Sequence, residues 1–198
     1  MIHENRGLIE PNKDIARRYA KRGYVALAPD LVSRAGGTDQ FLDDLTQATG
    51  ALGRSSPDDL VDDLLASVSY ISALVSVDSA LLGATGFCMG GGLVWRLIEA
   101  ATNIKSAVPF YGPTPPLDNV PNINAAVLGI YAELDTRITG SSDALYTALN
   151  AAGIANDKWI APGANHGFFN NTGGVYHPTD ALEAWQRALA WFAKTLIA

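Results

Sequence analysis

LLGATGFCMGGG, residues 81–92, predicts a strand, a sharp turn and a helix. A short apolar run gives way to a glycine-rich turn around Cys88, and apolar side chains then return at helical spacing. A strand that turns abruptly into a helix holds the residue at the turn in a strained backbone conformation. Gly86 and Gly90, two positions on either side of Cys88, allow neighbouring elements to approach this turn closely.

Cys88 is the candidate nucleophile of this turn. The turn lifts its sulfur clear of the sheet edge, and the following helix presents backbone N–H groups and the positive end of its dipole. Both features favour a thiolate and a developing oxyanion. A small buried thiol on a glycine-rich turn is the alternative interpretation, because free cysteines are often buried as small apolar residues.

The composition of the chain excludes several classes of partner and site. With 198 residues, 48% of them hydrophobic, it is long enough for one domain, residues 1–198, with a sizeable core. A net charge of −6 and a pI near 4.9 argue against a nucleic-acid or anionic-membrane surface. The single cysteine excludes an internal disulfide and a thiolate-rich metal site. With neither a signal peptide nor an apolar membrane span recognisable, we expect a cytoplasmic protein. We expect no metal or organic cofactor, because the three histidines are scattered along the chain.

Helices and strands alternate along the rest of the chain. Apolar periodicity, helix caps and glycine or proline stops place their boundaries. Helices are predicted at residues 11–22, 41–47, 57–71, 142–151 and 179–197, and strands at residues 24–28, 106–111, 125–132 and 158–161. This alternation predicts an α/β fold, with a mostly parallel sheet covered by helices on both faces.

Ligands of such a sheet bind beyond the carboxyl ends of its strands. Six residues that follow predicted strands carry useful chemistry: Glu4, Asp30, Cys88, Tyr111, Asp135 and His166. Three of them occur in the order nucleophile, acid and histidine, which is the order of the α/β-hydrolase fold. The residues at strand ends are therefore the candidate catalytic site.

Chemistry assigns a role to each member of this group. The thiolate of Cys88 attacks a carbonyl carbon, His166 helps to form the thiolate and later activates water, and Asp135 orients the imidazole. The backbone N–H of Met89 is expected to stabilise the oxyanion. A second donor is expected from the backbone N–H of Asn5, in the loop after the early strand.

Other polar residues have simpler expected roles. Glu133 competes with Asp135 for the acid role, but Asp135 lies further past the end of its strand. His177 is expected to be structural or exposed to solvent, and Arg34 to be a surface charge. The aspartates between residues 58 and 63 are expected to be a solvated helix start, which the helix dipole favours, and not a metal site.

The chain resembles the dienelactone hydrolase family, a carboxymethylenebutenolidase-like branch of the α/β-hydrolases with a cysteine nucleophile. The resemblance is carried by HENRG at residues 3–7, GYVALAPDL at 23–31, GFCMGG at 86–91, Asp135 in AELD and His166 in NHGFFN. It covers essentially the whole chain and implies a hydrolase of small carboxylic esters or lactones. It also implies that Glu4 holds the thiol in a resting state until substrate frees the thiolate, because a carboxylate opposes a nearby negative charge.

Two departures from the family pattern change this expectation. Family members that open dienelactone hold its carboxylate with arginines, one of them four residues after the catalytic histidine, where this chain has Asn170. A broader ester or lactone substrate is therefore expected. Relatives also have strands before the HENRG loop, of which Met1 and Ile2 remain here. We therefore expect a sheet that lacks its amino-terminal strands, and a chain less stable than its relatives.

Two other functions remain open from the sequence. A glutamine amidotransferase-like domain also carries a cysteine on a glycine-rich elbow, but its histidine usually lies in His-x-Glu, whereas Gly167 and Phe168 follow His166. A catalytically impaired fragment, or a non-catalytic binding module on the hydrolase scaffold, is favoured by the missing strands. For the hydrolase we expect a small-molecule ester or lactone as partner, neither nucleic acid nor membrane, and a monomer or weak homo-oligomer.

Overall fold

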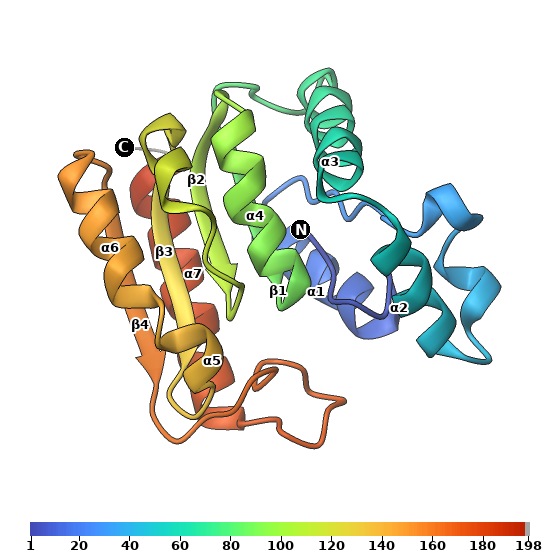
Figure 1. Cartoon of the computed structure of the whole chain (residues 1–198). Coiled ribbons are helices and arrows are strands. Elements are labelled where there is room, and N and C mark those ends of the chain that lie inside the picture. Colours follow the sequence, from blue (N-terminus) through green and yellow to red (C-terminus); the bar gives the residue numbers. More distant parts are fainter. Residues whose placement is uncertain (197–198) are drawn as a thin grey trace.

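Within residues 1–196, which the computed structural model describes, four parallel strands form one sheet (Figure 1). The strands lie side by side in sequence order: β1 (Leu82–Phe87), β2 (Ile104–Phe110), β3 (Ala126–Ala132) and β4 (Asn156–Ala161). Because the strands are parallel, their carboxyl ends lie at one edge of the sheet. This edge is where the sequence places the candidate site.

Helices cover both faces of the sheet (Figure 1). One face packs against α3 (Pro57–Ser72), α4 (Met89–Ala100) and α6 (Ser142–Ala151), and the other against α1 (Glu10–Ala20) and α7 (Pro178–Leu196). The described chain also contains α2 (Leu45–Arg54), the short α5 (Thr136–Thr139) and 3₁₀ turns at Ser33–Ala35, Thr38–Phe41 and Leu117–Asn122. Each face has its own cluster of buried apolar side chains, so the central strands are buried on both faces.

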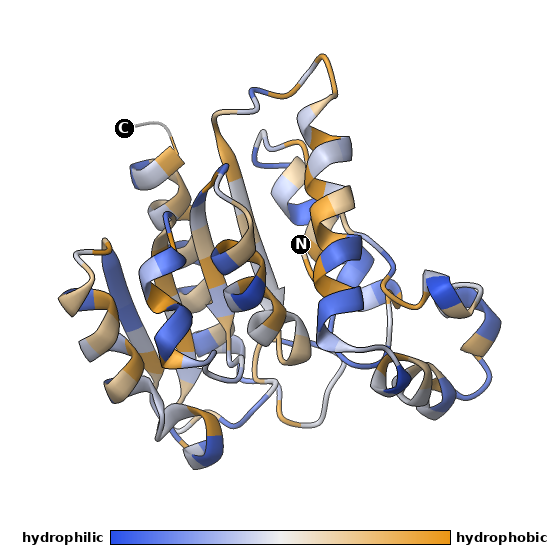
Figure 2. Ribbon diagram, turned by 45° about the horizontal axis from the view of Figure 1, so that its top comes forward, coloured by the Kyte–Doolittle hydropathy of each residue, from blue (hydrophilic) through white to orange (hydrophobic). Residues whose placement is uncertain are grey.

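The edge strand β4 is more hydrophilic than the other three strands (Figure 2). β1, β2 and β3 consist mainly of buried residues, whereas β4 begins with the hydrophilic Asn156, Asp157 and Lys158. β4 is an edge strand, where charged side chains oppose pairing with another chain. Along the described part of the chain, no helix is both long and apolar enough to span a lipid bilayer.

Most predicted elements are confirmed. The helix predicted at residues 142–151 has these bounds, and α3 begins at Pro57 as predicted because Ser56 forms a capping box over its first turn. Three predicted strands differ by at most two residues at either end from β2, β3 and β4. The last predicted helix begins within one residue of Pro178, and its predicted end at residue 197 lies outside the described residues.

The short helix predicted at residues 41–47 is wrong in both bounds. α2 begins at Leu45, because the side chain of Asp44 accepts a hydrogen bond from the backbone N–H of Thr46 and caps this end. It continues to Arg54, well past the predicted end. Apolar side chains on its inner face are buried, and this packing stabilises the longer helix.

The strand predicted at residues 24–28 is also wrong, because within residues 1–196 this segment has no regular secondary structure and pairs with no strand. Its apolar pattern is typical of a buried strand, yet a strand needs a neighbouring backbone to bond with. The amino group of Met1 donates a hydrogen bond to the carbonyl oxygen of Leu27 over 2.8 Å, and Ile2 forms an isolated parallel bridge with Gly86. Within residues 1–196 no strand lies beside this segment to pair with it, so the segment stays outside the sheet.

Candidate active site

Cys88 lies at the junction between β1 and α4, with a half-buried side chain. Its backbone has φ 56° and ψ −117°, a conformation that residues other than glycine rarely adopt. Its amide N–H donates to the carbonyl oxygen of Phe110 over 3.1 Å, which joins the turn to the end of β2. The predicted sharp strand-to-helix turn is confirmed, and it places Cys88 at the carboxyl edge of the sheet.

Close backbone packing requires glycine beside this turn. A Cβ atom at Gly90 would lie 2.5 Å from the carbonyl oxygens of Ile2 and His3. One at Gly86 would lie 2.3 Å from the carbonyl oxygen of Gly90. Both distances are shorter than real Cβ contacts, so the missing side chains let α4 approach the amino-terminal loop of residues 3–7.

Replacement of Cys88 by glycine is expected to give a more stable protein than replacement by alanine. Glycine adopts a φ of 56° without the steric cost of a Cβ atom, whereas alanine keeps that cost. We expect the free energy of unfolding of Cys88→Gly to exceed that of Cys88→Ala by about 1 kcal/mol, measured by urea denaturation. An equal or lower stability of Cys88→Gly would show that the turn carries no backbone strain.

Asp135 and His166 meet at the same edge from two different strands. Asp135 follows β3, and His166 lies in the loop after β4. The Nδ1 atom of His166 and the Oδ2 atom of Asp135 are 2.5 Å apart. Asp135 is buried, whereas 32% of the His166 side chain is exposed. The buried Asp135 carboxylate therefore contacts Nδ1 of the imidazole. Nε2 is then the ring atom available to the Cys88 side chain.

The pKa of His166 is raised from its ordinary value of 6.5 to about 9. The largest contribution is the hydrogen bond between the Cys88 side chain and the imidazole. Burial lowers this pKa, and the hydrogen bond to Asp135 raises it. Two acidic partners around one imidazole favour its protonated form. The arrangement therefore favours a protonated imidazole at His166.

The raised pKa of His166 predicts a pH-dependent stability. A histidine whose pKa is raised by folding stabilises the fold fully below its ordinary pKa of 6.5, and this contribution is lost as the pH rises through about 9. We expect the free energy of unfolding to fall between pH 6.5 and 9, and to fall less in His166→Gln. Urea denaturation at several pH values measures both slopes. An unchanged slope in His166→Gln would contradict the pairing of His166 with its acidic neighbours.

Glu4 lies beside this pair, in the loop after Ile2. Its Oε2 atom accepts a hydrogen bond from Nδ2 of Asn170 over 3.0 Å, and its Oε1 atom accepts one from the hydroxyl of Tyr111 over 3.5 Å. Burial raises the pKa of Glu4, although Asn170, His166 and Tyr111 oppose this effect. The structure thus brings Glu4 into the electrostatic surroundings of His166.

Tyr111 connects Glu4 with His166. Its side chain is fully buried, and its ring lies edge-on to the His166 ring with 5.0 Å between centroids. Burial raises the pKa of Tyr111 well above 10, and the charges of Glu4 and Cys88 raise it further. Its hydroxyl therefore keeps its proton and can donate it to the Glu4 carboxylate in a hydrogen bond.

The sequence around this site matches one protein family. The model of the dienelactone hydrolase family matches residues 1–196. The chain belongs to the dienelactone hydrolase family. A curated relative from Salmonella typhi, which carries the name carboxymethylenebutenolidase, is 34% identical over 205 residues. That alignment covers 98% of this chain and 76% of the relative.

Solved structures share the fold of this dienelactone hydrolase family member. A crystal structure named as a dienelactone hydrolase from Klebsiella pneumoniae has a TM-score of 0.86 at 30% identity, and the match covers 97% of this chain and 84% of the other. A dienelactone hydrolase-like promiscuous phosphotriesterase from metagenomic libraries has a TM-score of 0.84 at 22% identity, covering 98% and 84%, a likeness of fold alone. The chain has the α/β-hydrolase fold expected from its sequence. Membership of this hydrolase family implies a small-molecule substrate.

Glu133 is separated from the pair that Asp135 forms with His166. Glu133 is exposed, and its Oε2 atom accepts a hydrogen bond from the backbone N–H of Gly163 over 2.8 Å. Asp135, and not Glu133, therefore lies against His166. Its catalytic role stays a prediction.

Met89 and Asn5 carry the backbone N–H groups that the sequence assigns to an oxyanion. Met89 is the first residue of α4, and the N–H groups of a first helical turn have no acceptor within the helix. Asn5 lies in a turn, and its backbone carbonyl oxygen accepts a hydrogen bond from the hydroxyl of Thr49 over 2.9 Å. Their action on a developing oxyanion also stays a prediction.

His3 and Asp30 hold the loop that carries Glu4. The Nε2 atom of the buried His3 accepts a hydrogen bond from the backbone N–H of Leu31 over 3.0 Å, and its Nδ1 atom lies 2.6 Å from the carbonyl oxygen of Glu4. Asp30 accepts hydrogen bonds from both the backbone N–H and the hydroxyl of Thr38 over 2.7 Å, and the Thr38 hydroxyl oxygen accepts one over 2.8 Å from the backbone N–H of Leu8, directly after this loop. Both residues therefore organise this end of the family's HENRG segment.

His177 and Arg34 pair with aspartates outside the site. The Nδ1 atom of His177 lies 2.9 Å from Oδ2 of Asp180 in α7. On the surface, the Nε atom of Arg34 lies 2.7 Å from Oδ2 of Asp63 in α3. These positions confirm the structural and surface roles expected from the sequence. Within residues 1–196, no group of three or more histidine, cysteine, aspartate or glutamate side chains is arranged to hold a metal ion.

Sequence reasoning missed two neighbours of Glu4. It places Tyr111 at a strand end without a role, and it treats Asn170 as a departure from the family pattern. The structure brings both against the Glu4 carboxyl group. The signals for them were present, because Tyr111 follows β2 directly and Asn170 lies four residues after His166.

Proposed function

We propose that this chain is a thiol hydrolase that cleaves small carboxylic esters or lactones through an acyl-thioester on Cys88. The observation that carries the proposal is the contact of His166 with Asp135, beside Cys88 on a strained strand-to-helix turn. A nucleophile, a base and an orienting acid at the carboxyl edge of a parallel sheet support covalent acyl transfer. Family membership supports the hydrolase class.

The first half of the reaction forms the acyl-thioester. The thiolate of Cys88 attacks the carbonyl carbon, a C–S bond forms, and the carbonyl electron pair moves to oxygen. The N–H groups of Met89 and Asn5 stabilise this oxyanion. When the intermediate collapses, the C–O bond breaks and the leaving oxygen takes the proton of the His166 imidazolium. For a lactone, the new alcohol stays attached to the acyl group.

The second half hydrolyses the thioester. Neutral His166 takes a proton from water as the water oxygen attacks the thioester carbon, and Asp135 stabilises the imidazolium that forms. The C–S bond breaks, and the thiolate of Cys88 pairs again with protonated His166. An ester gives a carboxylic acid and an alcohol, and a lactone gives one hydroxy acid.

Glu4 is the residue proposed to control the proton of the resting thiol. Its buried carboxylate opposes a second negative charge nearby, which disfavours a standing thiolate. In Glu4→Gln, we expect faster alkylation of Cys88 by iodoacetamide at neutral pH, because the repulsion is lost. We expect about 10²-fold slower ester hydrolysis, because the negative charge that attracts the His166 imidazolium is lost as well.

Rates of alkylation and of p-nitrophenyl acetate hydrolysis measure these two effects in Glu4→Gln. The matched control is Glu183→Gln on the half-exposed surface of α7, which should leave both rates unchanged. Hydrolysis at the wild-type rate in Glu4→Gln would show that the Glu4 carboxyl group takes no part in the mechanism.

Asn170 supports a broad ester or lactone specificity. Its amide is neutral and donates to Glu4, whereas an arginine would bind a substrate carboxylate with a charged, forked group. The curated relatives carry the name carboxymethylenebutenolidase. For this chain we propose small esters and lactones that need no carboxylate for binding.

Alkylation of the single cysteine tests the proposed function. Iodoacetamide should modify Cys88 rapidly at neutral pH, because the nucleophile is activated by His166. An excess of a short-chain lactone should protect it, and His166→Gln should slow the modification. Slow labelling that the lactone leaves unchanged, in a folded protein, would contradict the proposal.

A further inference from the structure

The loop after His166 turns back at once and places Asn170 against Glu4. The backbone N–H of Asn170 donates to the carbonyl oxygen of Gly167 over 3.0 Å, which closes a tight turn directly after His166. The Nδ2 atom of Asn170 donates to Oε2 of Glu4, also over 3.0 Å. One short segment therefore carries both the imidazole of the proposed triad and an amide that contacts the Glu4 carboxyl group.

Phe169 anchors this segment to the turn that carries Cys88. Its buried ring stacks on the ring of Phe87, with 5.2 Å between centroids and 27° between the ring planes. Phe87 is the last residue of β1 and directly precedes Cys88. Packing of buried aromatic rings stabilises such a contact. The backbone of Asn170 is therefore held relative to the strand ends, which lets its side chain fix the position of another group.

Thr172 fixes the direction in which the Asn170 amide points. The Oδ1 atom of Asn170 accepts hydrogen bonds from the backbone N–H of Thr172 over 3.0 Å and from its hydroxyl over 2.8 Å. A side-chain amide has one accepting end and one donating end. The reversed amide would turn its oxygen towards the Glu4 carboxylate and its N–H groups towards two donors. Both neighbours therefore select the same orientation, with the N–H towards Glu4.

Asn170 is the nearer of the two described donors to the Glu4 carboxyl group. The hydroxyl of Tyr111 lies 3.5 Å from Oε1, whereas Nδ2 of Asn170 lies 3.0 Å from Oε2. Burial raises the pKa of Glu4, and the hydrogen bond from Asn170 is the largest effect that opposes this rise. A donor to a buried carboxylate stabilises its charged form. The Asn170 amide therefore affects both the position and the charge of Glu4.

We propose that Asn170 and Thr172 are positioning residues for Glu4: Thr172 orients the Asn170 amide, and this amide holds the Glu4 carboxylate in place. This inference rests on the proposed function, in which Glu4 controls the proton of the Cys88 thiol. Asn170 and Thr172 act through Glu4 and not on the reacting atoms. Loss of either contact should therefore slow the reaction only as far as Glu4 takes part in it.

Asn170→Asp tests the amide and keeps the turn. The aspartate has the same shape, and its oxygen still accepts from Thr172, but a second oxygen replaces the N–H that faces Glu4. Two adjacent carboxylates oppose each other's ionisation, so the pKa of Glu4 should rise. We expect the acid limb of the pH profile of kcat/KM for p-nitrophenyl acetate to move to higher pH, and kcat/KM at neutral pH to fall about tenfold. Asn122→Asp, which adds the same charge on the exposed turn before β3, should match the wild type.

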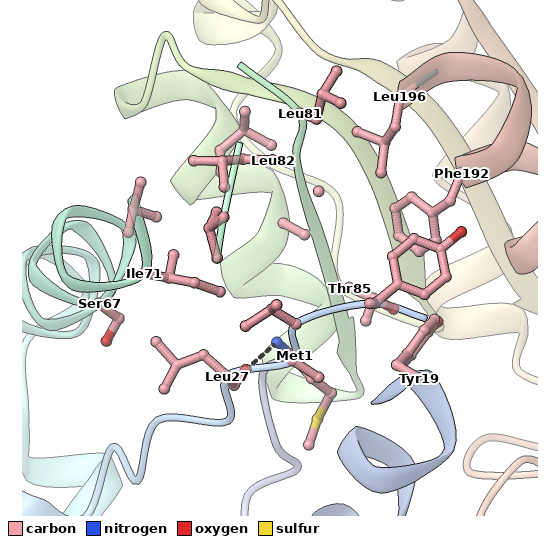
Figure 3. A pocket seen from close by; sticks show the side chains of 18 of the residues that line it. Met1, Tyr19, Leu27, Ser67, Ile71, Leu81, Leu82, Thr85, Phe192 and Leu196 are labelled. Atoms are coloured by element: carbon pink, nitrogen blue, oxygen red, sulfur yellow. Dashed lines mark hydrogen bonds between the residues drawn. The ribbon is translucent and has the colours of Figure 1, made fainter. Parts of the chain in front are cut away.

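Thr172→Val removes only the hydroxyl hydrogen bond to Asn170, and we expect about threefold lower kcat/KM. Thr172→Ser keeps a hydroxyl and should restore the wild-type rate. The matched control is Thr85→Val, beside the apolar cavity of about 290 Å³ along β1 (Figure 3). The Thr85 hydroxyl donates to the carbonyl oxygen of Val108, also over 2.8 Å. Its loss should lower the stability of the fold and leave kcat/KM unchanged.

A double variant shows whether Thr172 acts through Glu4. In the Glu4→Gln background, Thr172→Val should leave kcat/KM unchanged, because the carboxylate that the amide holds is absent. The same threefold loss in both backgrounds would show a general effect on the loop and would overturn the proposal.

The pKa of Glu4 can be measured without turnover. In Cys88→Ala protein labelled with ¹³C at the glutamate carboxyl groups, an NMR titration follows Glu4, whose signal is identified by its loss in Glu4→Gln. Asn170→Asp should raise the pKa of Glu4 in this background. An unchanged pKa would overturn the inference, even in an active enzyme. A raised pKa, in a protein whose wild-type form hydrolyses no ester, would support the contact and contradict the proposed function instead.

Discussion

Cys88→Ala is expected to hydrolyse p-nitrophenyl acetate at least about 10⁴-fold more slowly than the wild-type chain. Alanine preserves the backbone turn and most of the packing, but without sulfur no acyl-thioester can form. The release of p-nitrophenolate gives kcat/KM, and circular dichroism confirms that the variant is folded. Activity close to that of the wild type would show that Cys88 is not the nucleophile.

Cys88→Ser is the matched test of the thiolate. Serine differs from cysteine only in having oxygen in place of sulfur, but its hydroxyl proton is far less acidic and must be removed during attack. Since His166 and Glu4 surround a thiol here, we expect Cys88→Ser to be at least about 10²-fold slower than the wild type in the same assay. Near wild-type activity of Cys88→Ser would contradict the thiolate mechanism.

Loss of His166 or of the Asp135 charge is expected to give the second largest decrease in kcat/KM of ester hydrolysis. His166→Ala removes the group that exchanges protons with the thiol, the leaving oxygen and water, so kcat/KM should fall by about 10³–10⁴-fold. Asp135→Asn keeps the side-chain size but removes the negative charge 2.5 Å from Nδ1 of His166. It should lower kcat/KM by about 10²–10⁴-fold and leave the fold intact.

Glu133→Gln is the control for Asp135→Asn. Glu133 follows the same strand, but it is exposed and accepts a hydrogen bond from the backbone of Gly163. We therefore expect Glu133→Gln to hydrolyse esters at the wild-type rate. Equal losses in the two variants, or a loss confined to Glu133→Gln, would contradict the assignment of Asp135.

Local chemistry made the centre of the site predictable from the sequence. The glycines around Cys88 are needed because the backbone of Gly90 approaches the carbonyl oxygens of Ile2 and His3 at a distance that excludes a Cβ atom. The capping box at Ser56 likewise marks the start of α3 within a few residues of sequence. The capping box depends on neighbours in the chain. The glycines around Cys88 respond to a distant loop, but they form a compact pattern in the sequence, so both features are visible in one sequence.

Features that depend on distant partners were not predictable in the same way. The apolar pattern of residues 24–28 is typical of a strand, but a strand forms only beside a neighbouring strand, and within residues 1–196 none pairs with this segment. The hydrogen bonds of Glu4 to Tyr111 and Asn170 join three loops that are far apart in the chain. Only the folded arrangement of the strand ends brings these side chains together.

Trapping of an acyl group on Cys88 tests the central claim most directly. The wild-type chain is mixed with p-nitrophenyl pivalate, whose bulky acyl group slows hydrolysis of the thioester, and is quenched in acid for intact-mass and peptide mass spectrometry. We expect one pivaloyl group on the peptide that contains Cys88, released by neutral hydroxylamine and absent from Cys88→Ala. An acyl group on another residue, or turnover with unmodified Cys88 at every quench time, would contradict the thioester mechanism.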